Sequence, residues 1–211
     1  MTDPAQKSGM MSGMILGGLA AICTALVAVT HAITEPRIAA NQQAYLEQSL
    51  QPVLSGLSYD GNLSESTRIV LPPHELPGNS EVPIYRVYAD GVPIAALFVV
   101  SARDGFSGPI QLLIGIHVDG TITGVRVLDH RETPGLGDLI ETGKSDWIKQ
   151  FENKSLQDPP SAVWAIKRDG GTYDQLTGAS ITPRAVIKAI KQTLVFFNGH
   201  PELVFGTEKE T

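Results

Sequence analysis

The segment Asp174-Gln175-Leu176-Thr177-Gly178-Ala179-Ser180-Ile181-Thr182-Pro183 stands directly before the last long amphipathic stretch of the chain. Proline is favoured at the first position of a helix, and Thr182 is placed to be the N-cap of a helix that begins at Pro183. Because Asn198-Gly199 is a common C-terminal stop, we expect a helix over Pro183–Phe197. Its apolar residues recur at helical spacing: Val186, Ile190, Leu194 and Phe197.

The start of this expected helix has the properties of a phosphate site. Small residues ahead of it leave backbone N–H groups open, and a helix N-terminus adds partial positive charge. The hydroxyl groups of Thr177 and Ser180 stand beside that point. Three cationic side chains could supply counter-charge: Lys167, Arg168 and Arg184. An ordinary helix cap and turn uses the same residue types, and on the residues alone that interpretation is the commoner one.

Upstream of this segment, strand-like stretches alternate with turn signals. Asp119-Gly120 is a two-residue hairpin turn, and Ala89-Asp90-Gly91 separates a second pair of strand-like stretches. We expect a loop over His130–Asp138 and a short helix at Trp147–Phe151. The pattern predicts an α+β domain with strands at Pro83–Tyr88, Ile94–Val100, Pro109–Val118, Thr121–Asp129 and Ala162–Lys167.

The N-terminal stretch Met10–Ile33 holds no Asp, Glu, Lys or Arg and predicts one transmembrane helix. At a rise of ~1.5 Å per residue it covers the ~30 Å hydrocarbon core of a bilayer. A cleaved signal peptide is the alternative, but that class has a basic start and a shorter apolar stretch. Lys7 is the only basic residue ahead of the span and favours a cytoplasmic N-terminus. Small residues that could admit a partner helix recur every four positions: Gly13, Gly17, Ala21 and Ala25.

The segment Glu35-Pro36-Arg37 ends the apolar run, and Ile38–Leu54 then shows a helical pattern that predicts a stalk leading out of the membrane. Gly56–Ser80 is rich in Ser, Pro, Gly and Asn, so we expect an irregular connection there. The predicted organisation is a cytoplasmic N-terminus over residues 1–9, a transmembrane helix over 10–33, a helical stalk and connection over 34–80, and one α+β domain over 81–211.

Composition excludes several classes of function. The formal net charge is -6 and no run of Lys or Arg appears, so we expect no nucleic-acid partner. Cys23 is the only cysteine, so the chain can form no intramolecular disulfide and no Cys-based metal or iron–sulfur site. His130 and Glu132 lack further ligands, so no metal site is expected. The sequence contains no G-x-G-x-x-G segment of the kind that would indicate a nicotinamide site.

The string D-x-x-T-G-A-S, from Asp174 to Ser180, resembles the flavinylation motif of the FMN-binding domain family. Gly105–Ile110 and His130–Gly137 precede it in the order found in that family, and the resemblance covers nearly the whole chain. Within the family, the chain is similar to the G subunits of Rnf-type ion-translocating electron transport complexes. The longer C subunits of sodium-translocating NADH:quinone reductases are a second relative.

The resemblance implies that FMN is attached covalently, through a phosphoester to Ser180, by a flavin transferase. The acceptor position usually holds Thr in these subunits, so Thr177 and Thr182 are alternative acceptors. The loop at residues 132–137 is implied to lie against the isoalloxazine ring. Besides Ser180, the implied cofactor-binding residues are Asp174, Thr177, Gly178, Ala179, Thr182, Glu132, Thr133, Gly135, Leu136 and Gly137.

The resemblance also implies an electron-carrying subunit with no complete active site of its own, in a complex that couples ferredoxin/NAD redox chemistry to movement of Na⁺ or H⁺. Its partners are implied to be the other membrane subunits, membrane lipid and the flavin transferase. The implied location is the bacterial inner membrane, crossed once, with the FMN domain in the periplasm. Two other classes stay open: a non-redox membrane-anchored assembly module, and a serine hydrolase using Ser180, although the G-x-S-x-G elbow is absent.

Overall fold

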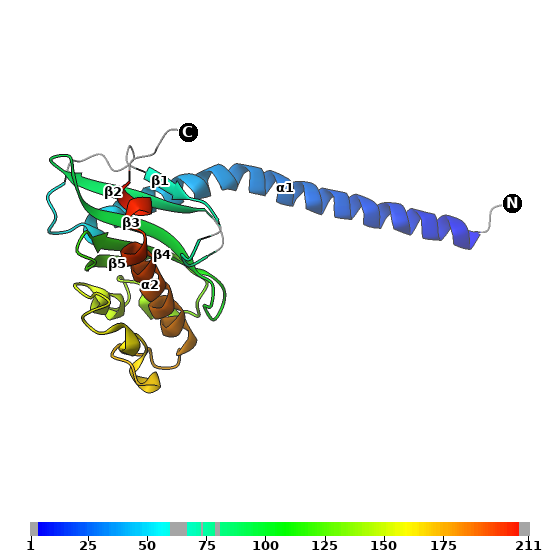
Figure 1. Cartoon of the computed structure of the whole chain (residues 1–211). Coiled ribbons are helices and arrows are strands. Elements are labelled where there is room, and N and C mark those ends of the chain that lie inside the picture. Colours follow the sequence, from blue (N-terminus) through cyan, green and yellow to red (C-terminus); the bar gives the residue numbers. More distant parts are fainter. Residues whose placement is uncertain (1–3, 60–66, 73, 79–80, 207–211) are drawn as a thin grey trace. The chain divides into compact units, whose positions relative to one another are not determined.

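The structure is a computed structural model that describes residues 4–59, 67–72, 74–78 and 81–206. The chain divides into two units, Met1–Tyr45 and Leu46–Thr211 (Figure 1). The helices are α1 (Pro4–Val53), α2 (Ile181–Gly199) and α3 (Pro201–Phe205), with short 3₁₀ turns η2 (Gly137–Ile140), η3 (Trp147–Phe151), η4 (Ser161–Val163) and η5 (Lys167–Asp169). The strands are β1 (Thr67–Val70), β2 (Val82–Ala89), β3 (Val92–Ala102), β4 (Ile110–His117) and β5 (Ile122–Asp129).

The first unit is the greater part of α1, a helix that is long and apolar enough to cross a membrane. Its described large apolar side chains are exposed, as lipid-facing residues are; Leu16 is 72% exposed. Three threonine hydroxyls bond to carbonyls of the preceding turn, at Ala20, Leu26 and Thr30. The polar groups of these side chains are therefore satisfied within the helix, as a bilayer requires.

The helix α1 runs without interruption through Pro36, so the segment that ends the apolar run does not end the helix. A proline inside a helix removes one backbone hydrogen bond but does not always end the helix. The expected span and the expected stalk are therefore parts of one continuous helix.

The second unit is built on one antiparallel sheet with strand order β1-β2-β3-β4-β5. The two hairpins predicted from the turn signals are confirmed. Positive φ angles at Asp90 (51°), Gly91 (75°) and Gly120 (85°) allow the tight reversals. The strands between these turns are consecutive, which places β3 and β4 in the interior of the sheet.

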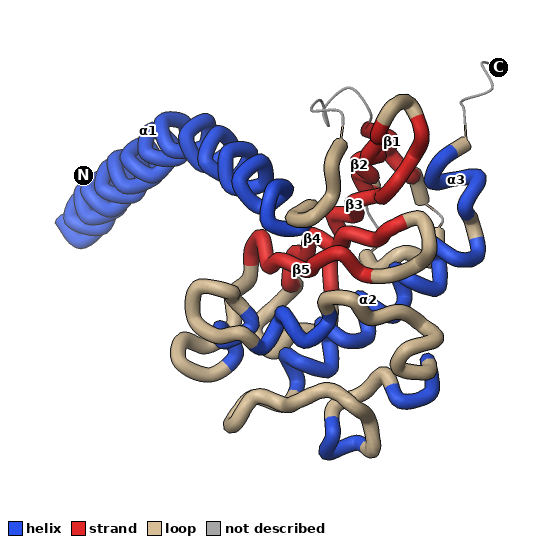
Figure 2. Tube along the Cα trace, turned by 90° about the vertical axis from the view of Figure 1, so that its left-hand side faces the viewer, coloured by secondary structure: helices blue, strands red, loops and turns tan. Residues whose placement is uncertain are grey.

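Both faces of the sheet are covered, which is why β3 and β4 are apolar on both sides. The helix α2 packs on one face, against residues that include Phe98, Leu112 and Ile114 (Figure 2). The last turns of α1 pack on the other face, where Leu50 and Val53 meet a cluster of Val87, Ala95, Leu97 and Leu113. This alternation along single strands is the period of two expected of a pleated sheet.

Two glycines in the sheet make room for the end of α1. A Cβ added at Gly115 would lie 2.4 Å from Val53 Cγ1, and one added at Gly124 would lie 3.1 Å from the Val53 Cα. Val53 itself is completely buried. The helix end therefore sits in a notch that exists only because these two positions lack side chains.

Replacing Gly115 with alanine is expected to lower the free energy of unfolding of the second unit by about 1–3 kcal/mol, the usual cost of overpacking. The new methyl group would also lie 2.3 Å from Thr123 Oγ1 in a sheet that cannot easily spread. Chemical denaturation of the full chain in detergent measures the effect. Gly143→Ala is the matched control, because nothing lies within 4 Å of its added Cβ. Equal stability of the two variants would contradict the packing argument.

Two segments have a different type of secondary structure from the one expected. The stretch Gly56–Ser80, expected to be irregular, contains β1, which pairs with β2 along Thr67–Val70. Ala162–Lys167 is not a strand; it lies in and between the 3₁₀ turns η4 and η5, with a single bridge from Ile166 to Tyr173. The short helix expected at Trp147–Phe151 is present as η3.

Candidate functional site

The helix α2 begins two residues earlier than the sequence predicts. Its N-cap is Ser180, at φ -95° and ψ -23°, and the Ser180 hydroxyl makes no capping hydrogen bond. Thr182 is therefore not the cap: it is 1% exposed, and its hydroxyl donates to the carboxylate of Glu132. The start of α2 thus carries one hydroxyl without a capping role, on Ser180, and one that is committed to a buried carboxylate.

The turn before α2 is held by contacts from the loops around it. Gly178 has a φ of +82°, and a Cβ there would lie 2.9 Å from Leu136 Cδ2, so Leu136 rests directly on this glycine. The Ala179 N–H donates to the Leu176 carbonyl at 3.2 Å. Glycine at 178 is required both by the left-handed backbone and by the close approach of the leucine.

Asp174, at the beginning of the same segment, is fixed through its backbone. The Trp147 indole N–H donates to the Asp174 carbonyl at 2.6 Å, and the Asp174 N–H donates to Gln150 Oε1 at 2.8 Å. The Asp174 side chain is exposed and pairs with Lys167 at 2.5 Å. The 3₁₀ turn η3 thereby anchors the segment that leads to Ser180, while the Asp174 carboxylate faces solvent.

The loop after β5 contributes a buried carboxylate, Glu132, which is 4% exposed. Its Oε1 accepts the Ser107 N–H at 2.9 Å, and its Oε2 accepts the Thr182 hydroxyl. A Cβ at Gly137 would lie 2.8 Å from Glu132 Cβ, so that position must be glycine for the loop to close over the carboxylate. Glu132 therefore joins three segments: the 105–107 loop, its own loop and the start of α2.

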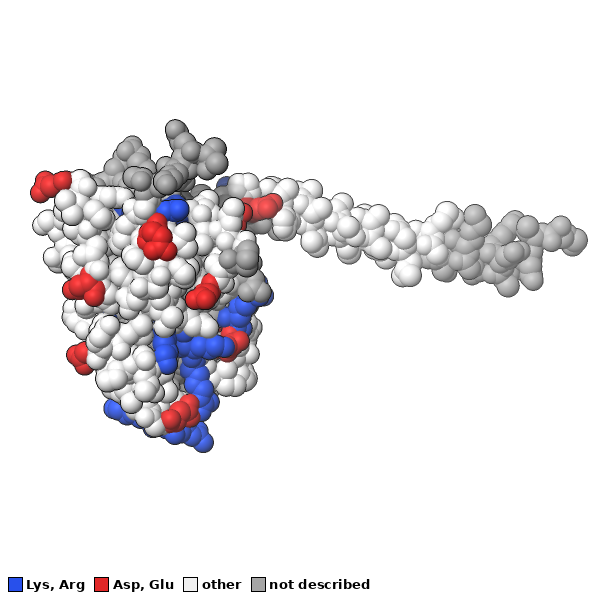
Figure 3. Space-filling view, in the orientation of Figure 1, with Lys and Arg blue, Asp and Glu red and all other residues white. Residues whose placement is uncertain are grey.

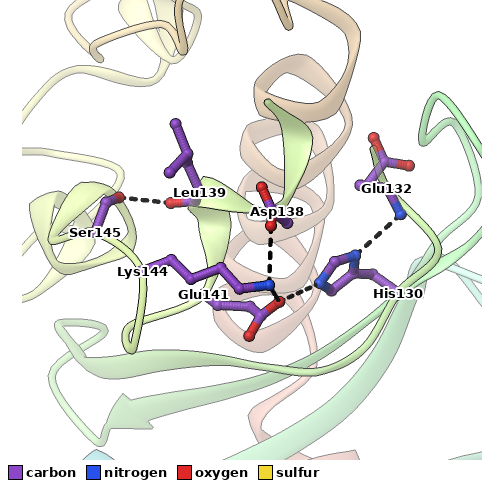
Figure 4. Close-up of polar contacts among 7 residues, drawn as sticks. All are labelled: His130, Glu132, Asp138, Leu139, Glu141, Lys144 and Ser145. Carbon is purple, nitrogen blue, oxygen red and sulfur yellow. Dashed lines mark hydrogen bonds and ion pairs between the residues drawn. The ribbon is translucent and has the colours of Figure 1, made fainter. Parts of the chain in front are cut away.

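A network of charged side chains lies behind this loop (Figure 4). His130 Nδ1 accepts the Glu132 N–H at 3.0 Å, which assigns the ring proton to Nε2, and Nε2 lies 2.8 Å from Glu141 Oε1. Lys144 Nζ bridges Glu141 Oε1 at 2.6 Å and Asp138 Oδ2 at 2.9 Å. The network fixes the backbone of Glu132 from the side away from its carboxylate.

The hydrogen bond from Lys144 holds the pKa of the Asp138 carboxyl below its ordinary value, although burial acts in the opposite direction. The same pairing, with Glu141 first and Asp138 second, raises the pKa of the Lys144 ammonium. Because the Asp138 pKa is lowered on folding, its contribution to stability is present above the ordinary carboxyl pKa and is lost as the pH falls through the lowered value.

These segments enclose a cleft of about 160 Å³ at the start of α2. Its wall combines three residues with hydroxyl groups, several small residues and three apolar side chains that are 40% or more exposed, Phe106, Leu136 and Ile181. The residues that line it are Phe106, Glu132, Thr133, Leu136, Gly137, Gly178, Ala179, Ser180, Ile181 and Thr182.

Eight of the eleven residues singled out from the sequence therefore meet in one cleft, although up to 50 positions separate them, as between Glu132 and Thr182. Three do not line it: Asp174, Thr177 and Gly135. Gly135 forms a turn with a φ of +77° in the loop. The sequence analysis did not name Phe106 or Ile181 as site residues. For Phe106 a signal was present, because it lies within the Gly105–Ile110 string that resembles the family.

Cationic side chains gather along part of the surface in Figure 3, but none of the described residues lining the cleft is a lysine or an arginine. Lys167 is paired with Asp174, and Arg184 makes two hydrogen bonds to Asp169, at 2.6 and 2.8 Å. The counter-charge expected from Lys167 and Arg184 is thus already committed to carboxylates, and Arg168, the third cation expected there, does not line the cleft. What remains for an anion is the helix start itself, whose first N–H groups have no partner within the helix.

Two family models match separate parts of the chain. A family model described as the RnfG N-terminal region matches residues 1–53, and one described as the FMN-binding domain matches residues 105–195. The G subunit of the ion-translocating oxidoreductase complex is 40% identical in Pseudoalteromonas atlantica, over 94% of this chain and 93% of the relative, and 40% identical in Pseudomonas aeruginosa, over 99% and 98%. In Vibrio atlanticus the identity is 41%, over 89% of each chain.

The chain belongs to the family of these G subunits. The N-terminal family region coincides with α1, and the FMN-binding region contains every residue that lines the cleft. The segment between the two regions supplies β1 to β3 of the sheet. The resemblance and the α+β fold with an apolar N-terminal helix are both confirmed.

Proposed function

We propose that this chain is the flavin-carrying electron-transfer subunit of a membrane-bound ion-translocating oxidoreductase complex, with FMN joined through its phosphate to the Ser180 oxygen. The observation that carries the proposal is the position of the Ser180 hydroxyl, which lines the cleft at the start of α2 and makes no capping bond. It stands where a helix N-terminus favours a phosphate and where apolar side chains can contact a flat ring.

The residues of the cleft fit FMN. The exposed apolar side chains of Phe106, Leu136 and Ile181 offer contacts to a flat ring, and the first N–H groups of α2 offer hydrogen bonds to a phosphate. Bound there, FMN supplies one- or two-electron redox chemistry, and the chain's own part is to hold and orient it.

The small size of the cleft supports a covalent tether. Pockets that bury drug-sized ligands are roughly 300–1,000 Å³, whereas this cleft measures about 160 Å³. Part of an FMN held there would remain exposed, so contact area alone would give limited affinity. An ester bond retains the cofactor without depending on that affinity.

Of the three hydroxyls considered as acceptors, Ser180 has the best position. Thr182 is buried and donates to Glu132, so its oxygen is neither accessible nor free. Thr177 is exposed and lies outside the residues that line the cleft. In the reaction, the Ser180 oxygen replaces AMP on the flavin phosphate of FAD, and AMP leaves. The product gains the mass of FMN less one water.

The apolar part of α1 anchors the domain to the membrane. We assign residues 10–33 to the bilayer of the bacterial inner membrane, residues 1–9 to the cytoplasm, 34–80 to a stalk and connection, and the FMN domain, 81–211, to the periplasm, where a flavin transferase would act. Other subunits of the complex would supply and accept the electrons, in ferredoxin/NAD chemistry coupled to Na⁺ or H⁺ movement.

The test is to express the full chain with a flavin transferase, purify it in detergent, denature it and measure its intact mass and in-gel flavin fluorescence. We expect fluorescence that stays with the polypeptide and the mass of one FMN less one water. A colourless chain of unmodified mass would favour a non-redox assembly module. A flavin that washes away on denaturation would keep the cofactor but overturn the ester.

A further inference from the structure

Of the described residues that line the cleft, Glu132 is the one with an acidic or basic side chain. It is 4% exposed, so its carboxylate lies in the wall of the cleft and out of bulk water. A buried charge is costly unless it is well hydrogen-bonded, which makes its presence here a feature to be explained.

The hydrogen bonds around Glu132 match the charged form of the side chain. The Ser107 N–H is a backbone group that can only donate, and it points at Oε1. The Thr182 hydroxyl donates to Oε2. An ionised Glu132 can accept from both partners at once, because neither of its oxygens then carries a proton.

The architecture of the cleft does not itself need this charge. In Glu132→Gln, the amide oxygen could accept the Ser107 N–H, and the amide NH₂ could donate to the Thr182 oxygen, because a hydroxyl can turn and accept. The same three segments would stay joined, at the same side-chain length. The negative charge is therefore an addition to the structural role, and its effect falls on whatever occupies the cleft.

Resting on the function proposed above, we propose that the Glu132 carboxylate lowers the reduction potential of FMN held in this cleft. An electron passed to a flavin held in this cleft from another redox group of the complex would add negative charge near the fixed negative charge of Glu132. In a wall shielded from water that repulsion is weakly screened, so reduction becomes less favourable. Glu132 is in this sense a positioning and tuning residue.

The experiment is a spectroelectrochemical titration of the flavinylated full chain in detergent, at mildly alkaline pH, for the wild type and Glu132→Gln. The covalent tether keeps flavin in the variant even if its contacts weaken. We expect the midpoint potential of Glu132→Gln to move to more positive values. A midpoint equal to the wild type, or more negative, would overturn the inference.

The matched control is Glu152→Gln, which removes the same charge from a residue that does not line the cleft. Glu152 pairs with Arg126 at 3.3 Å and is not among the residues lining the cleft. Its midpoint should stay at the wild-type value. An equal shift in both variants would show a general effect of net charge and would also overturn the assignment to Glu132.

Thr182→Val provides a second variant of nearly the same shape, in case Glu132→Gln fails to fold. It keeps the charge but removes one of the two donors that compensate it, so the midpoint should move in the opposite direction, to more negative values. A positive shift in this variant would contradict the inference. A wild-type chain that carries no flavin after maturation would instead contradict the proposed function. Failure of the proposed function is therefore distinguishable from failure of the inference about Glu132.

Discussion

A chain in which alanine replaces Ser180 is expected to leave the flavin transferase reaction with no covalent flavin. The change removes the one oxygen at the start of α2 that lines the cleft and makes no capping hydrogen bond. The fold should be preserved, because the Ser180 side chain makes no cap for the helix to lose. Intact mass and in-gel fluorescence after denaturation measure the loss, which should be complete.

Two further variants show whether the loss belongs to the hydroxyl. Ser180→Thr restores an oxygen at the same position and should recover the covalent flavin. Ser161→Ala makes the same chemical change at an exposed serine of η4, outside the cleft, and should be flavinylated like the wild type. Flavin that persists in Ser180→Ala would contradict the assignment, and peptide mapping would then distinguish Thr177 from Thr182 as the acceptor.

Local sequence signals predicted the parts of the fold that depend on neighbours in the chain. The hairpins follow from turn residues between alternating strands, and the long C-terminal helix follows from a period that persists over several turns. The strand β1 was not predicted, because its four residues, Thr67–Val70, stand among polar and proline-rich segments. These residues form a strand through their pairing with β2. Pairing of that kind leaves no local signature.

The start of α2 shows the same limit at the site. Thr182 has the composition of an N-cap, yet its hydroxyl serves Glu132, which lies 50 residues earlier in the chain. Asp174 belongs to the motif, yet Trp147 and Gln150 hold its backbone so that its side chain lies outside the cleft. Neither outcome follows from spacing, because both depend on contacts between segments that only the folded chain brings together.

The convergence of the 132–137 loop with the segment before α2 was expected from the family resemblance alone. Nothing in the periodicity of either segment predicts that they meet. Phe106 illustrates what even the resemblance left out: a single aromatic residue in a glycine-containing loop has no pattern, and its 65% exposed ring is recognised as a site residue only beside the cleft.

Replacing Phe151 with alanine is expected to lower the free energy of unfolding by about 3–5 kcal/mol, the usual cost of removing a buried aromatic ring. Phe151 is fully buried, and its ring centroid lies 5.4 Å from that of Trp147 and 4.6 Å from that of Tyr173. Because Trp147 donates to the Asp174 carbonyl, the cavity would also loosen the segment that leads to Ser180. Chemical denaturation of the full chain in detergent, followed by tryptophan fluorescence, measures the stability.

Phe106→Ala is the matched control: it makes the same substitution at an exposed ring, so the comparison isolates the effect of burial on stability. With 65% of its surface exposed, Phe106 should change the free energy of unfolding by less than about 0.5 kcal/mol. The loss of unfolding free energy should therefore be several-fold larger in Phe151→Ala than in Phe106→Ala, although both variants have the same number of aromatic residues. A loss of under about 1 kcal/mol in Phe151→Ala would mean that the cluster relaxes around the missing ring. The aromatic residues would then not be the rigid support of the segment that carries Ser180.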